Sequence, residues 1–282
     1  MILVFGSSGQ VASELKSLLP DAVFWGRGEV DLLTETDLCA KIEALRPEGI
    51  INAAAYTAVD KAEQEEENAL RINAEAPAEM AKAACRLEVP LVHISTDYVF
   101  DGQGERAFLP EAAPDPLSAY GRSKLAGEQA ICGTGATFAI LRTSWVFSDH
   151  GANFLKTMLR LSETRDQLKI VGDQVGGPTP ARAIAEACVK IVQTLQNDPT
   201  KSGVYHISGA PDVSWADFAR EIFRQAERGV VVEDIPTSEY PTPAARPANS
   251  RLDCSSLSVF GLERPDWKTA VTNTLLKLDA IS

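Results

Sequence analysis

The first dozen residues restrict the fold more than any other part of the chain. Ile2-Leu3-Val4-Phe5 is an apolar run with the length of a buried parallel strand. Gly6-Ser7-Ser8-Gly9-Gln10-Val11-Ala12 follows at once, and residues 13–19 have a helical pattern. Such a strand, tight turn and helix bring backbone N–H groups against a pyrophosphate. An ordinary tight turn has similar spacing, but the position after the first strand favours a dinucleotide site that uses Gly6, Gly9, Gln10 and Val11.

Strand and helix patterns alternate through the first half of the chain. After the first strand and helix, the predicted strands are 22–25, 49–52, 89–95 and 138–142, and the predicted helices are 34–45, 75–87 and 117–131. Thr34, with Asp37 three residues later, resembles a capping box at the start of the 34–45 helix. The alternation predicts an α/β fold of Rossmann type, with a doubly wound parallel sheet and functional residues at the carboxyl ends of its strands.

The second half of the chain has a different pattern. Prolines gather between shorter helical stretches such as 215–226, while 182–195 has the pattern of a helix that returns to the sheet. We therefore predict a dinucleotide-binding domain at 1–145, joined by about 180–196. A smaller, interleaved substrate-binding region should occupy most of 146–282.

Composition excludes several classes of protein. A formal net charge of −12 over 282 residues argues against a nucleic-acid surface, and no apolar run approaches the roughly 18 residues that span a membrane. The first five residues lack the charge and length of a signal peptide. The five cysteines are scattered without Cys-x-x-Cys spacing, as expected for reduced thiols in the cytoplasm. His93, His150 and His206 are far apart in sequence and do not indicate a metal site.

Tyr120-Gly121-Arg122-Ser123-Lys124 places a phenol and an ammonium four residues apart. On a helix this spacing puts both side chains on one face, where the charge of Lys124 is expected to lower the pKa of Tyr120. A phenol tuned in this way can exchange a proton near neutral pH. The pair is common on solvated helices, but Ser95-Thr96 after a buried strand and the glycine loop favour a catalytic role.

The end of the predicted second strand bears on cofactor choice. Proteins selective for NAD usually carry an acid there, which bonds the adenosine ribose. Here the strand runs into Gly26 and Arg27 instead. A guanidinium at this position can pair with a 2′-phosphate, so we expect NADPH as cofactor, with NADH as the alternative. Glu29 and Asp31 lie close in sequence and weaken this preference, and Arg27 could also be a solvated loop charge.

Several longer motifs are similar to those of a known family. The glycine loop and the segments 52–63, 95–100 and 120–124 resemble the extended short-chain dehydrogenases/reductases. The more specific likeness is to the dTDP-4-dehydrorhamnose reductases, and it covers nearly the whole chain. It rests on Val59-Asp60-Lys61-Ala62-Glu63, Arg142-Thr143-Ser144-Trp145-Val146-Phe147, and Arg246-Pro247 with Asn249-Ser250-Arg251-Leu252.

The resemblance implies that NADPH reduces the C4 ketone of dTDP-4-dehydro-L-rhamnose to give dTDP-L-rhamnose for cell-surface polysaccharide. It also implies roles for three residues. Tyr120 would be the proton donor, Lys124 would tune Tyr120 and hold the nicotinamide ribose, and Thr96 would hydrogen-bond both the ketone and Tyr120. Hydride transfer builds negative charge on the carbonyl oxygen, which needs such donors.

Further binding residues follow from the same likeness. Asp97, Trp145, Asn153, Lys156 and Arg246, together with Thr96, are expected on the substrate side, although Trp145 could equally be a core aromatic. On the cofactor side, the glycine loop would meet the pyrophosphate. Asp31 and Leu32 would contact the adenine, and Ala55, Tyr56 and Thr57 would line the groove.

Members of this family can bind magnesium through glutamates at a dimer contact, which makes a homodimer a candidate assembly. Glu14 matches one such position, but Arg182 and Lys277 fall at the others. Cations at these positions repel a metal ion, so we expect no magnesium site and a salt bridge at Glu14 instead.

Two alternative functions stay open on the sequence. A sugar-nucleotide dehydratase of the same superfamily would share the fold, but it would carry a glutamate base where this chain has Tyr98. A regulatory subunit that binds NADP without catalysis, similar to the β subunit of methionine adenosyltransferase, would also keep the fold.

Overall fold

The computed structural model describes residues 1–281, and it confirms the predicted α/β class. Within those residues the largest sheet has six parallel strands in the order β10-β5-β4-β3-β1-β2. The strands are β1 Ile2–Phe5, β2 Val23–Trp25, β3 Gly49–Asn52, β4 Leu91–Thr96, β5 Phe138–Thr143 and β10 Gly203–Ile207. β3, β4 and β5 are almost entirely buried, as expected for central strands covered by helices on both faces.

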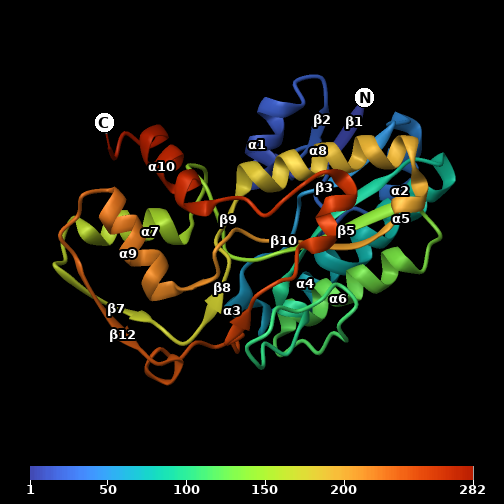
Figure 1. Cartoon of the computed structure of the whole chain (residues 1–282). Helices are drawn as coiled ribbons and strands as arrows, with labels where there is room; N and C mark the ends of the chain where they lie inside the picture. The colour runs from blue at the N-terminus through green and yellow to red at the C-terminus, as the bar shows by residue number, and fades with distance from the viewer. Residues whose placement is uncertain (282) are drawn as a thin grey trace.

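Helices cover both faces of this sheet (Figure 1). On one face lie α1 Gln10–Leu18 and α8 Ala181–Asn197, which pack against each other. The other face is covered by α2 Leu38–Leu45, α5 Ala76–Leu87 and α6 Ala119–Cys132, with α3 Val59–Ala62 and α4 Glu66–Leu70 nearby. A single turn of π-helix, Arg71–Glu75, joins α4 to α5 without a break.

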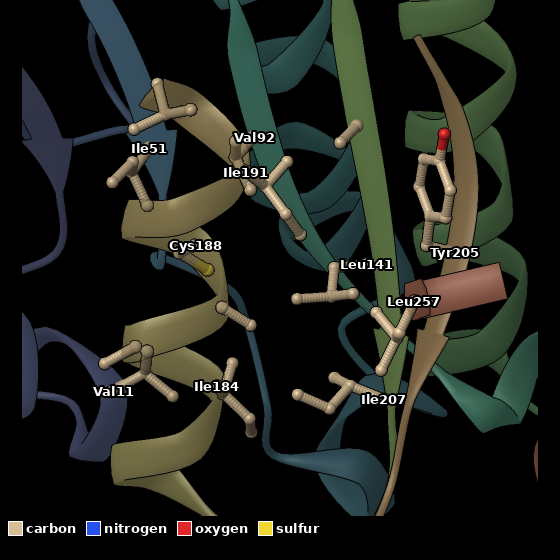
Figure 2. Close-up of a cluster of buried hydrophobic side chains, with 14 of the residues drawn as sticks. Val11, Ile51, Val92, Leu141, Ile184, Cys188, Ile191, Tyr205, Ile207 and Leu257 are labelled. Atoms are coloured by element: carbon tan, nitrogen blue, oxygen red, sulfur yellow. The ribbon is translucent and has the colours of Figure 1, made fainter. Parts of the chain in front are cut away.

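The core between the sheet and α8 is built from aliphatic side chains of both (Figure 2). Val92 and Leu141 of the sheet face Ile184, Cys188 and Ile191 of α8, and all five are fully buried. Burial of each of the four aliphatic side chains contributes about 1.5–3 kcal/mol to the free energy of folding. This packing ties residues from the second half of the chain to the dinucleotide-binding half.

Residues after Trp145 contribute more to the large sheet than the sequence predicted. α8 corresponds to the predicted return at about 180–196, and β10 then forms the sheet edge beside β5. The segment Ser255–Phe260 adds Leu257 and Phe260 to the same core. The assignment of the two regions to cofactor and substrate stays a prediction.

The remaining elements form a smaller lobe beside the sheet (Figure 1). Its helices are α7 Phe154–Ser162, α9 Trp215–Gln225 and α10 Trp267–Lys277, of which only α9 was predicted. Its short strands are β6 Val146–Phe147, β7 Gln167–Val171, β8 Val175–Gly176, β9 Thr179–Pro180, β11 Val213–Ser214, β12 Val231–Ile235 and β13 Asn249–Ser250. These helices enclose a second core around Phe218 and Trp267.

One predicted helix begins later than expected. The sequence placed a helix start at Thr34, but α2 begins at Leu38. The reason is a turn at Asp31, whose carbonyl accepts hydrogen bonds from the N–H groups of Thr34 and Glu35. The Asp31 carboxylate also accepts from Leu33 N. The backbone N–H groups of Thr34 and Glu35 therefore belong to this turn and not to the first turn of a helix. The prediction of a capping box at Thr34 is wrong.

Candidate active site

A cleft of about 450 Å³ lies at the carboxyl edge of the large sheet, where the chain leaves β1, β3, β4 and β5. It is the position expected for a ligand in an open parallel sheet. The lining includes many of the predicted site residues: Gly9, Gln10, Val11, Ala55, Thr57, Thr96, Asp97, Tyr120, Lys124 and Trp145. Segments that are up to about half the chain apart in sequence therefore meet in one place.

The glycine loop forms one end of the cleft. Gly6 has φ +101°, and a Cβ on it would lie 3.2 Å from the Ala53 carbonyl, so this tight turn favours glycine. α1 starts at Gln10, and no side chain of the described residues caps its first N–H groups. An uncapped helix N-terminus that opens into a cleft has donors for an anion, so these residues fit a diphosphate.

The residues predicted to meet the adenosine lie just beyond this end. Arg27 is exposed and lies two residues beyond β2, whose last residue, Trp25, accepts a hydrogen bond from Gly6 N at 2.8 Å. Asp31 forms the turn described above, and Leu32 is buried beside it. Neither these three residues nor Tyr56 belongs to the cleft lining. Tyr56 directs its hydroxyl to Glu65 at 2.6 Å.

Thr96 and Tyr120 meet at the middle of the cleft. Thr96 ends β4, and Tyr120 lies in the first turn of α6, whose N-cap Ser118 accepts a hydrogen bond from Gly121 N at 3.1 Å. Burial raises the pKa of the Tyr120 phenol, and the Thr96 side chain opposes this only in part. The phenol therefore keeps its proton at neutral pH, which is the state that a proton donor needs.

Lys124 does not act on Tyr120 as the sequence indicated. Its Nζ donates to the Ile94 carbonyl at 2.7 Å and lies 3.0 Å from His93 Nε2. Burial lowers the pKa of Lys124 to about 8, against the opposing charge of Glu128. The expected lowering of the Tyr120 pKa by Lys124 is therefore wrong for this structure, because burial dominates and Lys124 Nζ faces β4.

A buried ion pair behind Lys124 was missed by the sequence analysis. Arg142 Nη2 lies 2.6 Å from Glu128 Oε2, and Ser95 Oγ donates to Glu128 Oε1 at 2.5 Å. Glu128 is on α6 one turn beyond Lys124, and both members of the pair are at most about 5% exposed. The pair fixes α6 to β4 and β5. The Arg142 segment was noted only as a family motif, and nothing in the spacing pointed to Glu128.

Trp145 forms part of the wall of the cleft. Its ring stacks on Trp215 with centroids 3.6 Å apart, and its backbone is in the left-handed region at φ +51°. Such a conformation is costly for a bulky residue and persists where surrounding contacts enforce it. Here Thr179 N donates to the Trp145 carbonyl at 3.1 Å. Trp145 lines the cleft and is not a core aromatic.

Several buried polar side-chain atoms have no hydrogen-bond partner among residues 1–281, and two of their residues, Asp97 and Thr143, line the cleft. The atoms are Asp97 Oδ2, Thr143 Oγ1, Arg246 Nη1, Ser250 Oγ and Ser256 Oγ. Burial raises the pKa of Asp97 to about 6, although the Thr96 hydroxyl, 3.1 Å from Asp97 Oδ1, acts against it. Unpaired buried polar groups are costly, so a polar ligand would satisfy those that border the cleft. Thr143 lines the cleft and was not singled out from the sequence.

The other three predicted substrate residues are engaged with protein groups. Asn153 caps α7 by accepting from Lys156 N and donates to Gln10 Oε1 at 2.9 Å. Lys156 Nζ donates to the Asp149 carbonyl at 2.8 Å. Arg246 Nη2 pairs with Asp60 at 2.8 Å. None of the three is in the cleft lining, so the structure gives Asn153 and Lys156 positioning contacts and leaves Arg246 at the edge of the site.

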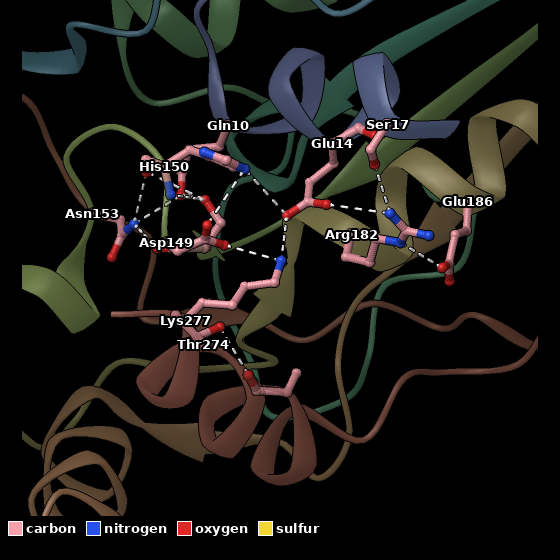
Figure 3. A network of polar contacts seen from close by, with 12 residues as sticks. Gln10, Glu14, Ser17, Asp149, His150, Asn153, Arg182, Glu186, Thr274 and Lys277 are labelled. Atoms are coloured by element: carbon pink, nitrogen blue, oxygen red, sulfur yellow. Dashed lines mark hydrogen bonds and ion pairs between the residues drawn. The ribbon is translucent and has the colours of Figure 1, made fainter. Parts of the chain in front are cut away.

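Glu14 lies in a charged network at the junction of α1, α8 and α10 (Figure 3). Its carboxylate is 3.6 Å from both Arg182 Nη1 and Lys277 Nζ, and it lies beside Asp149 and His150. Glu14, Asp149 and His150 could offer three metal ligands, but the two cations already neutralise the carboxylates. The residues present do not fit a divalent cation, and the expected salt bridge at Glu14 is present.

The comparisons with known proteins point to one family. The family profile described as the RmlD substrate binding domain matches residues 1–280. A dTDP-4-dehydrorhamnose reductase from Sinorhizobium fredii is 43% identical over 277 residues, which cover 95% of this chain and 94% of that protein. The chain belongs to the dTDP-4-dehydrorhamnose reductase family.

Solved structures of dTDP-4-dehydrorhamnose reductases agree with this assignment. The enzyme from Clostridium acetobutylicum superposes with a TM-score of 0.91 at 35% identity, covering 99% of both chains. The enzyme from Bacillus anthracis, solved in complex with NADP, has a TM-score of 0.90 at 33% identity, covering 98% of both chains. The family's fold therefore extends over essentially the whole chain.

Proposed function

We propose that this chain uses NADPH to reduce the C4 ketone of dTDP-4-dehydro-L-rhamnose, producing dTDP-L-rhamnose for cell-surface polysaccharide. The observation that carries the proposal is the meeting of Thr96, Tyr120 and Lys124 with the glycine loop in one cleft. Membership of the reductase family over nearly the full length supports the same substrate. The NADP complex of the Bacillus anthracis relative supports the cofactor.

The cofactor and the sugar nucleotide would bind at opposite ends of the cleft. The cofactor's diphosphate would lie against Gly9, Gln10 and Val11, and its ribose would reach Lys124. When bound, the reduced nicotinamide supplies a hydride. The sugar would lie between Trp145 and Thr96, where Asp97 and Thr143 have free oxygen atoms among the described residues.

Protein groups would then handle the charge that develops on the ketone oxygen. Tyr120 holds its proton because burial raises its pKa, and it would donate that proton to the oxygen. Thr96 Oγ1 lies 3.1 Å from Asp97 Oδ1 and accepts from Tyr98 N, so its position at the end of β4 is fixed. A fixed hydroxyl beside the phenol would stabilise the developing charge without reorganisation.

The direct test is to mix the purified chain with NADPH and dTDP-4-dehydro-L-rhamnose and follow the near-ultraviolet absorbance of NADPH. We expect absorbance to fall only when both are present, with dTDP-L-rhamnose as the product by mass spectrometry and NMR. The corresponding UDP-4-dehydro sugar is the matched control. Binding of NADPH without turnover would instead support a regulatory subunit, and release of water from a dTDP-hexose would support a dehydratase.

Two features bear on the compartment and the assembly in which the activity would take place. No helix within residues 1–281 is both long and apolar enough to cross a membrane. All five cysteines are free, as a reducing compartment requires. We propose a cytoplasmic enzyme, with a homodimer as the candidate assembly. Fractionation and gel filtration would test these two points.

A further inference from the structure

His93 is a buried titratable residue to which the proposed chemistry gives no role. It lies in the middle of β4 with 0% of its surface exposed. It pairs in the sheet with Asn52 of β3, and its side chain bridges Asn52 and Lys124. These contacts put a second ionisable group directly behind a residue that would hold the cofactor.

The orientation of the Asn52 amide follows from its neighbours. Ala54 N donates to Asn52 Oδ1 at 3.1 Å, which requires an oxygen at that position. The Asn52 Nδ2 group, which is only a donor, then lies 2.9 Å from His93 Nδ1. His93 Nδ1 must therefore accept a hydrogen bond and carries no proton.

This arrangement selects one tautomer of His93. Burial alone, the largest cause, holds the pKa of His93 well below its usual range, so the ring is neutral whichever form Lys124 takes. A neutral ring without a proton on Nδ1 carries its proton on Nε2. His93 Nε2 is 3.0 Å from Lys124 Nζ, so its N–H points at the nitrogen of the lysine.

Only one form of Lys124 can accept that N–H. An ammonium has three donors and no lone pair, whereas a neutral amine can accept from His93 and still donate to the Ile94 carbonyl at 2.7 Å. We propose that Asn52 and His93 are positioning residues that hold Lys124 as a neutral amine against β4, through a fixed tautomer of the imidazole. Burial, which lowers the pKa of Lys124 to about 8, acts in the same direction.

The other charged and titratable groups around Lys124 do not reverse this conclusion. Glu128 on α6 favours the ammonium, but its charge is compensated by the ion pair with Arg142 of β5. Tyr120, also on α6, is protonated and neutral. For Lys124 to donate to His93 as an ammonium, the imidazole would need its proton on Nδ1 and the Asn52 amide would have to turn.

Turning the Asn52 amide would have a cost in the cleft. Ala54 N would face an amide donor instead of the Asn52 oxygen. Ala54 lines the cleft beside the glycine loop. The protonation of Lys124 is therefore coupled to the backbone where the cofactor is proposed to bind. A cofactor that favours the ammonium form of Lys124 would bind against the free-energy cost of rearranging Asn52 and His93.

The first test observes the tautomer directly. The chain has three histidines, so labelling with ¹⁵N-histidine gives three imidazoles, which long-range ¹H–¹⁵N spectra can resolve. His93 is assigned by comparison with the His150→Gln and His206→Gln spectra. We expect a neutral His93 with its proton on Nε2 in the cofactor-free enzyme. A proton on Nδ1, or a charged ring near neutral pH, would overturn the proposal.

The second test changes the tautomer with an isosteric substitution. In Asn52→Asp the carboxylate can accept both from Ala54 N and from a proton on His93 Nδ1, which leaves Nε2 free to accept from an ammonium. We expect the Nδ1–H tautomer by NMR. We also expect the basic limb of the pH profile of kcat/KM to move up by about one pH unit, which is in the range for a changed charge partner. If His93 keeps its proton on Nε2 in Asn52→Asp, the proposal that Asn52 selects the tautomer is wrong.

A double variant separates the tautomer from a direct effect of the added charge. In a His93→Leu background, Asn52→Asp should no longer move the basic limb. An equal shift in both backgrounds would overturn the role of His93. If His93→Leu does not fold, the NMR spectra of the wild type and Asn52→Asp decide the question alone. The kinetic arm rests on the proposed function, but the NMR arm does not, so failure of one is distinguishable from failure of the other.

Discussion

At the residue scale, burial moves the ionisable side chains of the cleft toward their neutral forms. It raises the pKa of Tyr120, raises that of Asp97 to about 6 and lowers that of Lys124 to about 8. Each shift is dominated by loss of solvent and not by a neighbouring charge, which is the usual behaviour of ionisable groups at the base of a ligand site. The charges in the ligand-bound cleft would therefore come mainly from the ligands and not from these side chains.

Removing the phenol hydroxyl tests the proposed proton donor. Tyr120→Phe should lower kcat by about 10²–10⁴, the usual contribution of general acid catalysis. The ring is kept, so the Kd for NADPH measured by fluorescence titration should change little. Turnover close to that of the wild type would exclude Tyr120 from the proton transfer.

Arg27 tests the cofactor preference. It is exposed two residues beyond the end of β2, and we propose that it pairs with the 2′-phosphate of NADPH. A charge-assisted contact contributes roughly 1.5–3 kcal/mol, so NADPH should exceed NADH by about one to two orders of magnitude in kcat/KM. Arg27→Ala should remove most of that difference and leave NADH activity intact. Arg46→Ala, on the loop after α2, is a control for loss of a positive charge. Unchanged selectivity in Arg27→Ala would refute the assignment.

Asp97 should destabilise the ligand-free protein in a pH-dependent way. Its folded-state pKa, about 6, lies above the ordinary aspartate value of 3.8. The protonated form is therefore favoured by folding, and its stabilising contribution is present below about pH 4 and is lost as the pH rises through about 6. The amide of Asp97→Asn cannot ionise, so the variant does not lose this stability as the pH rises.

The advantage of Asp97→Asn in urea unfolding should therefore grow by roughly 1 kcal/mol or more between about pH 5 and about pH 7.5. Asp101→Asn, a few residues further along the same segment, controls for removal of one negative charge. A stability difference between Asp97→Asn and the wild type that does not depend on pH would show that Asp97 has an ordinary pKa.

At the scale of single elements, α6 carries most of the proposed chemistry. It holds Tyr120 in its first turn, Lys124 one turn later and Glu128 after that, and it is fixed by the Ser118 cap at one end and by the Glu128–Arg142 pair further along. The positions of Tyr120 and Lys124 therefore depend on how α6 is held at these two points.

The cap of α6 should affect both stability and turnover. Ser118→Ala removes the acceptor for Gly121 N and should lower the free energy of unfolding by about 1 kcal/mol. It should also lower kcat, because Tyr120 lies in the loosened turn. Asp266→Ala, which removes the cap of α10, is the matched control and should cost similar stability with little effect on kcat. Equal effects of the two variants on kcat would contradict a special role for the α6 cap.

At the scale of the whole molecule, the cleft depends on contacts between the two halves of the chain. Trp145 reaches the cleft because it stacks on Trp215 of the smaller lobe, and Glu14 of α1 lies against Lys277 of α10. The 149–150 segment joins the same charged network and continues into Gly151 and Ala152 at the cleft.

This network predicts the response to metal removal. Because Arg182 and Lys277 neutralise Glu14, EDTA should leave the activity unchanged, and added magnesium should not alter the elution volume on gel filtration. In Arg182→Glu/Lys277→Glu the same positions become acidic, and magnesium dependence should appear. Activity of the wild type that is lost in EDTA and restored by magnesium would show that the family's metal site is retained.

The sequence alone determined the fold class and singled out Thr96, Tyr120 and Lys124, which line one cleft. The glycine loop after a strand, the alternation of periodic segments and the Tyr120–Lys124 spacing are local patterns, and a short-range pattern is readable without knowing the fold. The predicted strand 49–52 agrees with β3 at both ends. The family motifs then indicated which ligands the cleft would take.

Only the tertiary structure decided what the charged residues do. The direction of Lys124 toward His93, the Glu128–Arg142 pair and the position of β10 at the sheet edge all join residues distant in sequence. The late start of α2 depends on how the Asp31 turn uses its donors. Desolvation and hydrogen-bond geometry arise only when the chain is packed, so the sign of a pKa shift could not be read from a four-residue spacing.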